Sequence, residues 1–324
     1  MRKEDVIAFL GDDWVKMTAQ MREALHTDIS LLATTNEGLL SHSGKLLRPI
    51  LTMLMARACA GYCSADTIRF ATTVELLHNA TLLHDDVADE SSERRGMPTV
   101  NSLLGPQSAV LIGDFWLARA MDKVMETDRF SRSVIKIFSD TLVDLAEGEM
   151  LQLEKASTAD TTEEDYLRII RCKTASLFVS ACSSAAVSVD ATADHTAAAV
   201  AYADALGVAF QIKDDILDYN GGGELGKPVG IDLMERKITL PLLGALKGSP
   251  REAEMRSKVR EIREHPDYCG EIRNFVLERG GVEYASARLD GYVEKAVRAL
   301  DVFPDGEAKE MLAELARFNA LRRV

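Results

Sequence analysis

One acidic pattern, DDxxD, occurs twice in the sequence, at residues 85–89 and 214–218. Each copy follows a run of apolar residues with helical spacing, and positions i, i+1 and i+4 of a helix lie on one face. Each copy therefore presents three carboxylates to the same space, where cations must neutralise their repulsion. Carboxylate oxygens suit Mg²⁺, which prefers to share its coordination with substrate phosphates. Two such motifs facing one cavity would make a magnesium site for a diphosphate.

Composition favours a helical protein and excludes some partners. The chain has 324 residues, of which 47% are apolar and only 8 are proline. Sustained period-two alternation, which would indicate strands, is nearly absent, whereas helical spacing runs through most of the chain. A net charge of −13 argues against binding to nucleic acid or to anionic lipid. Because no stretch is apolar enough for a signal peptide or a membrane span, we expect a cytoplasmic protein.

The helical pattern predicts one all-α domain over residues 1–324. Helices are expected at residues 3–30, 44–60, 65–92, 106–126, 131–155, 163–189, 194–220 and 232–247, followed by shorter peripheral helices from about residue 250. The Gly- and Pro-containing breaks between them are too short to be interdomain linkers. A cavity that uses both acidic motifs also requires the two halves of the chain to pack together.

Basic residues accompany both motifs. They are Lys45 and Arg48 near a predicted helix start, Arg94 and Arg95 after the first motif, Lys173 before an apolar helix, and Lys227 and Lys237 after the second motif. Any one of them is more often a surface charge. Together they would provide fixed donors for a second diphosphate that is bound without metal. A phosphate-binding P-loop at Gly44-Lys45 is excluded, because its glycine spacing is wrong and Leu46 replaces the required Ser or Thr.

From Gly44 to about Pro241 the chain resembles the all-trans isoprenyl diphosphate synthases, or polyprenyl synthetases. The matching segments are GKLLRP at 44–49, HDDVADESSERR at 84–95, EGEMLQL at 147–153, KTASL at 173–177, FQIKDDILD at 210–218 and GKPVGIDLMERKITLP at 226–241. Their order and spacing are far more specific than any one of them. One departure is Arg236, where many members have a glycine before the lysine.

The resemblance implies an isoprenoid-synthase-type helical bundle around a central cavity, and it implies a role for each matching residue. Asp85, Asp86, Asp89, Asp214 and Asp218 would bind about three Mg²⁺ ions on the allylic diphosphate, with Asp215 behind them. Arg94, Lys173, Thr174, Gln211 and Lys227 would bind the allylic diphosphate itself. Lys45, Arg48, His78 and Arg95 would hold isopentenyl diphosphate without metal. The aspartates 85, 86, 89 and 214, with Lys173 and Lys227, form the expected catalytic set.

The implied reaction needs no side-chain nucleophile. Divalent ions stabilise the departing diphosphate, the alkene of isopentenyl diphosphate attacks the allylic cation, and a proton is lost. Members of the family commonly form homodimers, so we expect one here. The preferred primer, whether dimethylallyl, geranyl or farnesyl diphosphate, is left open by the sequence.

Two small residues on the helix before the first motif predict a long product. Ala80 lies five residues before Asp85, about 7–8 Å along the helix axis at 1.5 Å per residue, and Thr81 is its neighbour. In the family, aromatic side chains at these positions close the product pocket early. We therefore expect a product of about seven to ten isoprene units. The alternatives are a farnesyl or geranylgeranyl diphosphate synthase, or small residues that only allow tight helix packing.

Three other functions fit the sequence less well. A class I terpene cyclase shares the first motif, but its second metal motif normally mixes Asn, Ser or Thr, and Glu. A helical metal phosphohydrolase built on His84 and Asp85, with His42 or His78, leaves the second motif unexplained. A non-catalytic partner subunit would be expected to lose aspartates, whereas this chain keeps all six.

Overall fold

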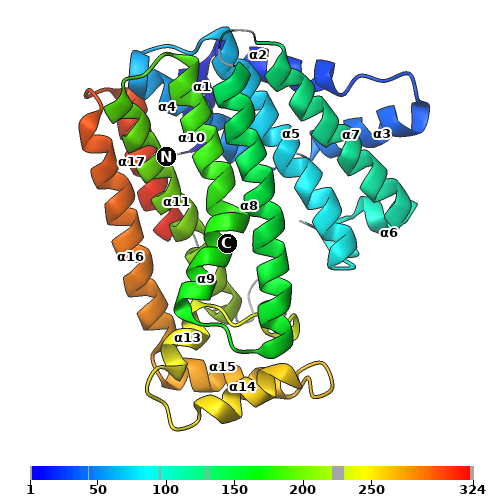
Figure 1. Ribbon diagram of the computed structural model, residues 1–324, viewed down its shortest axis with the longest axis vertical. Coiled ribbons are helices and arrows are strands. Elements are labelled where there is room, and N and C mark those ends of the chain that lie inside the picture. The colour runs from blue at the N-terminus through cyan, green and yellow to red at the C-terminus, as the bar shows by residue number, and fades with distance from the viewer. Residues whose placement is uncertain are drawn as a thin grey trace. The chain divides into compact units, whose positions relative to one another are not determined.

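The structure is a computed structural model that describes residues 2–42, 44–94, 96–127, 129, 131–220 and 230–321. The prediction of a helical fold is confirmed. Within these residues helices follow one another through short turns (Figure 1), and one antiparallel pair joins β1 (Glu93–Arg94) to β2 (Met97–Pro98).

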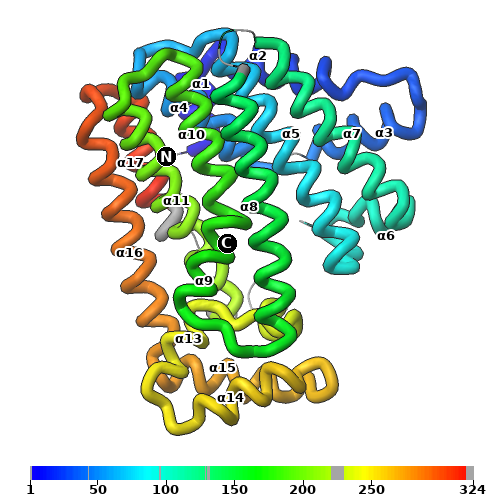
Figure 2. Tube along the Cα trace, in the orientation of Figure 1, coloured from blue at the N-terminus to red at the C-terminus, as the bar shows by residue number. Residues whose placement is uncertain are grey.

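The helices divide into an N-terminal and a C-terminal series. The first series is α1 (Lys3–Leu10), α2 (Asp12–Ala24), α3 (Ser30–Ser41), α4 (Leu47–Ala60), α5 (Ala65–Ala88), α6 (Val100–Leu104), α7 (Pro106–Met125) and α8 (Ser131–Thr158). The second is α9 (Glu163–Ile170), a π turn (Arg171–Ala175), α10 (Ser176–Ser188), α11 (Ala193–Asn220), α12 (Ile231–Met234), α13 (Leu240–Leu246), α14 (Glu252–Arg260), α15 (Tyr268–Glu278), α16 (Gly281–Ala299), a 3₁₀ turn (Leu300–Val302) and α17 (Glu307–Leu321). Figure 2 follows the chain through them.

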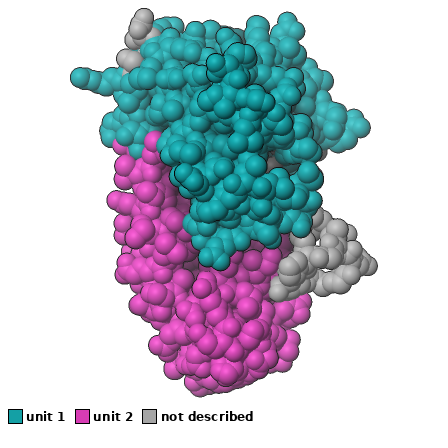
Figure 3. All heavy atoms as spheres, turned by 90° about the vertical axis from the view of Figure 1, so that its right-hand side faces the viewer, with its two compact units in different colours: residues 1–139, 180–199, 302–312 teal, residues 140–179, 200–301, 313–324 magenta. Residues whose placement is uncertain are grey.

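The chain forms two compact units, coloured separately in Figure 3. Unit 1 comprises residues 1–139, 180–199 and 302–312, and unit 2 comprises residues 140–179, 200–301 and 313–324. The first acidic motif belongs to unit 1 and the second to unit 2, so each motif is described within its own unit. That one domain encloses both motifs around a cavity stays a prediction.

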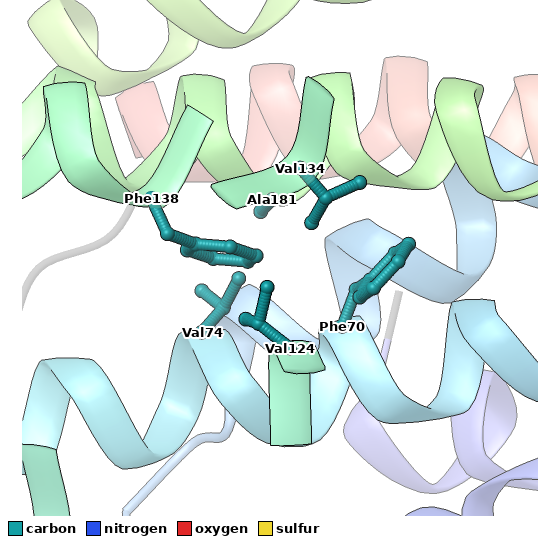
Figure 4. Packing of buried hydrophobic residues seen from close by; sticks show 6 residues of the cluster. All are labelled: Phe70, Val74, Val124, Val134, Phe138 and Ala181. Carbon is teal, nitrogen blue, oxygen red and sulfur yellow. The ribbon is translucent and has the colours of Figure 1, made fainter. Parts of the chain in front are cut away.

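A buried apolar cluster fixes the first half of α5 in unit 1 (Figure 4). It consists of Phe70 and Val74 from α5, Val124 from α7, Val134 and Phe138 from α8, and Ala181 from α10. The two phenylalanine rings lie 6.4 Å apart between centroids. Burial of one large apolar side chain contributes about 1.5–3 kcal/mol. Since α5 is anchored here, its C-terminal end holds the first motif in a defined place.

In unit 2 a π turn interrupts the helical run from α9 to α10. One glycine from each of two neighbouring helices packs closely against this turn. A Cβ on Gly148 of α8 would lie 2.6 Å from Cβ of Cys172. A Cβ on Gly207 of α11 would lie 2.5 Å from Cα of Ala175. Real side chains do not tolerate such distances, so the backbones of α8 and α11 pack directly against this turn. Wider turns of this kind often occur at functional sites.

Besides the run expected at 163–189, which contains the π turn, three expected helices are divided or end more than three residues from their expected bounds. The helix expected at 3–30 is broken at Gly11, which has a φ of +57°, and α2 ends at Ala24. The helix expected at 65–92 ends at Ala88, because Glu90 has a φ of +51°. The helix expected at 232–247 is divided into α12 and α13, since Pro241 in the first turn of α13 cannot continue an earlier helix.

Within the described ranges, none of the helices combines the length and the apolar content needed to cross a bilayer.

Candidate functional site

The first motif lies at the C-terminal end of α5. Asp85 and Asp86 belong to the last turn of the helix, and Asp89 caps it with its backbone outside the helical conformation. Asp86 is only 5% exposed, and its Oδ1 accepts a hydrogen bond of 2.7 Å from Nε of Arg94. Burial raises the pKa of Asp86, whereas Arg94 acts in the opposite direction. Asp86 and Arg94, expected to bind metal and diphosphate respectively, are therefore paired with each other.

The loop after the motif folds back onto the end of α5. The backbone carbonyl of Asp86 accepts hydrogen bonds from N of Ser91, at 2.9 Å, and from Nδ2 of Asn101, at 3.1 Å. Such contacts satisfy the carbonyls that a helix end leaves without intrahelical partners. They also hold Arg94 of β1 beside the motif. Arg95, the other arginine of this loop, lies outside the described residues.

Helix α7 packs against α5 next to the motif (Figure 1). Nε2 of His84 lies 3.3 Å from the carbonyl oxygen of Val110 and 3.3 Å from Oδ1 of Asp114. A side chain at Gly113 would collide with the imidazole ring. The glycine therefore allows α7 to hold His84, the residue that precedes the acidic pair.

The remaining predicted residues of unit 1 lie on α4 and α5. Lys45 is exposed in the turn before α4, whose N-cap Leu46 has a left-handed backbone, and Arg48 is half-buried in the first turn. His78 is half-buried on α5, and its carbonyl oxygen accepts a 2.8 Å hydrogen bond from the hydroxyl of Thr81. Ala80 is fully buried.

The second motif lies near the C-terminal end of α11. Asp214 is half-buried, whereas Asp215 is only 2% exposed. Oδ2 of Asp215 accepts a 2.6 Å hydrogen bond from the hydroxyl of Tyr166, and Oδ1 accepts one of 2.9 Å from Nε2 of Gln211. Burial raises the pKa of Asp215 well above its usual value. Asp215 therefore binds protein groups on both oxygens.

Asp218 contacts backbone amides at the start of α12. Its carboxylate accepts hydrogen bonds from N of Gly230 at 3.2 Å, Ile231 at 3.1 Å and Asp232 at 3.4 Å. Burial raises the pKa of Asp218, and these amides oppose that shift. The amides thus use acceptor sites that a metal ion would share, and the expected metal-binding role of Asp218 stays a prediction.

Sequence reasoning missed Asp232. Burial raises its pKa to about 6, and the carboxylates of Asp218, Glu235 and Asp214 add to that effect while Lys237 opposes it. A fourth carboxylate therefore belongs to the second acidic cluster. The signal was present in the matched segment GKPVGIDLMERKITLP, which contains this aspartate, but it is not part of either DDxxD motif.

The π turn presents two predicted substrate-binding residues. Lys173 forms an ion pair with Glu149 of α8. The hydroxyl of Thr174 donates a 2.8 Å hydrogen bond to Oε1 of Gln211 on α11. The structure thus brings Thr174, Gln211 and Asp215 together. Lys227 lies outside the described residues.

The acidic clusters fit a hard divalent cation by their chemistry. All their donors are carboxylate oxygens, which suit Mg²⁺ and Ca²⁺. The raised pKa of Asp232, caused by burial and by neighbouring carboxylates, reflects a local excess of negative charge that a cation would relieve. Within the described part of the chain, no group of three or more His, Cys, Asp or Glu side chains is placed to hold a metal ion by itself. Diphosphate oxygens and water commonly complete the coordination of Mg²⁺.

Comparison with known proteins gives one consistent result. The family model described as polyprenyl synthetase matches residues 29–275. An octaprenyl diphosphate synthase of Escherichia coli is 37% identical over 99% of this chain and 99% of its own length. The crystal structure of a decaprenyl diphosphate synthase from Rhodobacter capsulatus has a TM-score of 0.93, with 35% identity and full coverage of both chains.

A further solved structure is informative about ligands. The polyprenyl synthase from Caulobacter crescentus, complexed with calcium and isoprenyl diphosphate, has a TM-score of 0.91 at 35% identity, over 100% of this chain and 98% of its own. The family uses divalent metal and isoprenyl diphosphate substrates. The chain therefore belongs to the polyprenyl synthetase family and is a trans-polyprenyl diphosphate synthase.

Proposed function

We propose that this enzyme condenses an allylic diphosphate with isopentenyl diphosphate to give a long-chain product, about C35–C50. The observation that carries the proposal is the pair of complete acidic motifs combined with small residues before the first one. Relatives of this chain are mostly long-chain synthases. Ala80 and Thr81 lack the bulk that would close a product pocket at this point of α5.

We propose Mg²⁺ as the divalent ion, in about three copies, held by Asp85, Asp89 and Asp214. We add Asp232 to these proposed metal ligands, because its carboxylate belongs to the second acidic cluster. Asp86 and Asp218 stay candidates, although the structure gives them protein partners. When bound, Mg²⁺ neutralises charge on the diphosphate and makes it a better leaving group.

The basic and polar residues bind and orient the two substrates. Lys173 and Gln211 are proposed to donate hydrogen bonds to the allylic diphosphate, together with Arg94 and Lys227. Thr174 is proposed to contribute through Gln211, to which it donates its one hydroxyl hydrogen. Lys45, Arg48, His78 and Arg95 are proposed to hold isopentenyl diphosphate. Charge-assisted hydrogen bonds from Lys and Arg are about twice as strong as neutral ones. Orientation matters because the alkene must lie against the allylic carbon whose bond to diphosphate breaks.

The substitution Ala80→Tyr tests the product length. A bulky ring at this buried position should block elongation and shift products toward shorter chains, with incorporation of the first isopentenyl unit retained. Products formed from each allylic primer with Mg²⁺ would be measured by mass spectrometry. Thr81→Tyr, at a half-exposed neighbour, gives the same test if the first variant does not fold. An unchanged product distribution in a folded variant would refute the assignment.

We further propose that the enzyme is a cytoplasmic homodimer. The support for a dimer is an apolar face on α8, where Val143, Met150 and Leu153 are each more than half exposed. Large exposed apolar side chains at helical spacing are typical of a surface that becomes covered.

A further inference from the structure

A four-residue hydrogen-bond chain connects three elements of unit 2. Tyr166 of α9 donates to Asp215 of α11 at 2.6 Å. Asp215 accepts from Gln211, one turn earlier on the same helix, at 2.9 Å. Gln211 accepts in turn from Thr174 of the π turn at 2.8 Å. Tyr166 and Asp215 are 4% and 2% exposed, so solvent does not compete for their bond.

The chain fixes the orientation of one amide group. A carboxylate only accepts hydrogen bonds, and the phenol of Tyr166 supplies a donor to one of its oxygens. In its ionised form Asp215 then requires the NH₂ end of Gln211 at its other oxygen, which is the orientation found. A rotated amide would place its oxygen against the carboxylate, where two acceptors repel. In the observed orientation the amide NH₂ of Gln211 has a second N–H that is available as a donor. The oxygens of a diphosphate only accept hydrogen bonds, so this N–H suits them.

The π turn explains how Tyr166 and Thr174 both contact α11. Residues eight apart on a regular α-helix differ in direction by about 80°, at 3.6 residues per turn. A π turn holds more residues per turn, which changes the direction of every residue after it. Gly207 lets α11 approach this turn so closely that Thr174 reaches Gln211.

We propose that Tyr166 is a positioning residue for the allylic diphosphate: through Asp215 it holds the amide of Gln211 with its N–H groups toward the substrate. The inference rests on the proposed function, in which Gln211 contacts that diphosphate. Tyr166 itself is buried and lies outside every motif of the sequence. Its loss should therefore weaken binding of one substrate and not of the other.

The substitution Tyr166→Phe removes the hydroxyl and keeps the ring. We expect KM for the allylic diphosphate to rise about ten-fold, the effect of one lost hydrogen bond to a charged group, while KM for isopentenyl diphosphate changes little. Binding of inorganic pyrophosphate in the presence of Mg²⁺, measured by calorimetry, should weaken by a similar factor. The matched control is Tyr219→Phe, since Tyr219 is a second buried tyrosine of unit 2, 1% exposed, whose hydroxyl is not part of this hydrogen-bond chain.

A double-mutant cycle shows whether Tyr166 acts through Gln211. In a Gln211→Ala background, the substitution Tyr166→Phe should have almost no further effect on either quantity. A loss that persists in full in that background, or equal changes in KM for both substrates, would overturn the proposal. If Tyr166→Phe does not fold, Asp215→Ala removes both acceptor oxygens of the chain and enters the same cycle.

If the proposed function is wrong, the experiments give a different set of results from those that overturn the role of Tyr166. In that case the wild-type protein would form no prenyl product from any primer, while the effect of Tyr166→Phe on pyrophosphate binding could still be measured. A wild-type protein that binds no pyrophosphate with Mg²⁺ would overturn the positioning role as well.

Discussion

Several carboxylates of unit 2 are buried, and burial disfavours their charged form. The pKa of Asp232 is raised from 3.8 to about 6, chiefly by burial. In the folded state this group therefore binds a proton more readily than in the unfolded chain. Its contribution to stability is full below the unfolded pKa and is lost as pH rises through about 6.

A pH series tests this linkage. Without divalent metal, the thermal midpoint should rise by a few degrees when pH is lowered from 7.5 to 5.5, because a buried charge is removed. Asp232→Asn should flatten that slope and raise the midpoint at pH 7.5. Asp290→Asn, at an exposed position of α16, is the control and should follow the wild type. An unaltered slope in Asp232→Asn would show that another group titrates.

Site residues that repeat or have a regular spacing could be predicted from the sequence. Site residues whose role depends on a tertiary contact could not. The two DDxxD motifs and the basic residues could be recognised from the chain alone. Tyr166 could not, since its partner Asp215 is 49 residues away and one Tyr in an amphipathic helix suggests only core packing. Glu149 was likewise missed, because its pairing with Lys173 depends on how α8 meets the π turn.

Among the elements, the π turn is packed closely against the backbone of its neighbours. Gly207→Ala would place a methyl group 2.5 Å from Cα of Ala175, so one backbone must move. We expect a loss of about 1–3 kcal/mol in the free energy of unfolding and a lower kcat, since Lys173 and Thr174 shift with the turn. Urea denaturation and steady-state kinetics measure the two effects.

The control for that prediction is Gly291→Ala on α16, where a new Cβ would have no atom within 4 Å. Alanine favours a helix over glycine by about 1 kcal/mol, so this variant should be as stable as the wild type or more so. Equal stability of the two variants would contradict the close packing at Gly207.

Element positions were largely predictable, and element boundaries were not. Helical spacing correctly indicated one helical run over 163–189, but it gave no sign of the π turn inside it. One extra residue in a turn barely alters the apolar pattern of a helix that is buried on several sides. The break at Gly11 was missed because a lone glycine is also tolerated within helices.

For the whole molecule, the exposed face of α8 leads to a prediction about assembly. Val143, Met150 and Leu153 are 53%, 67% and 55% exposed at spacings of seven and three residues, the pattern of a helix–helix contact. Light scattering after gel filtration should give about twice the chain mass of 35.5 kDa. Met150→Glu should shift the protein toward the monomer, whereas Leu277→Glu, at an exposed leucine of α15, should not. A monomeric wild type would contradict the dimer.

We propose that both acidic motifs serve one ionisation step. The most direct measurement is the single-turnover rate of allylic diphosphate consumption in Asp85→Asn, Asp214→Asn and the double variant. Each single change should slow the step about 10²–10³-fold, and the double variant should be hardly slower than either one, because groups that act as a unit are not additive. Losses that multiply, or a single variant with the wild-type rate, would show that the motifs act separately.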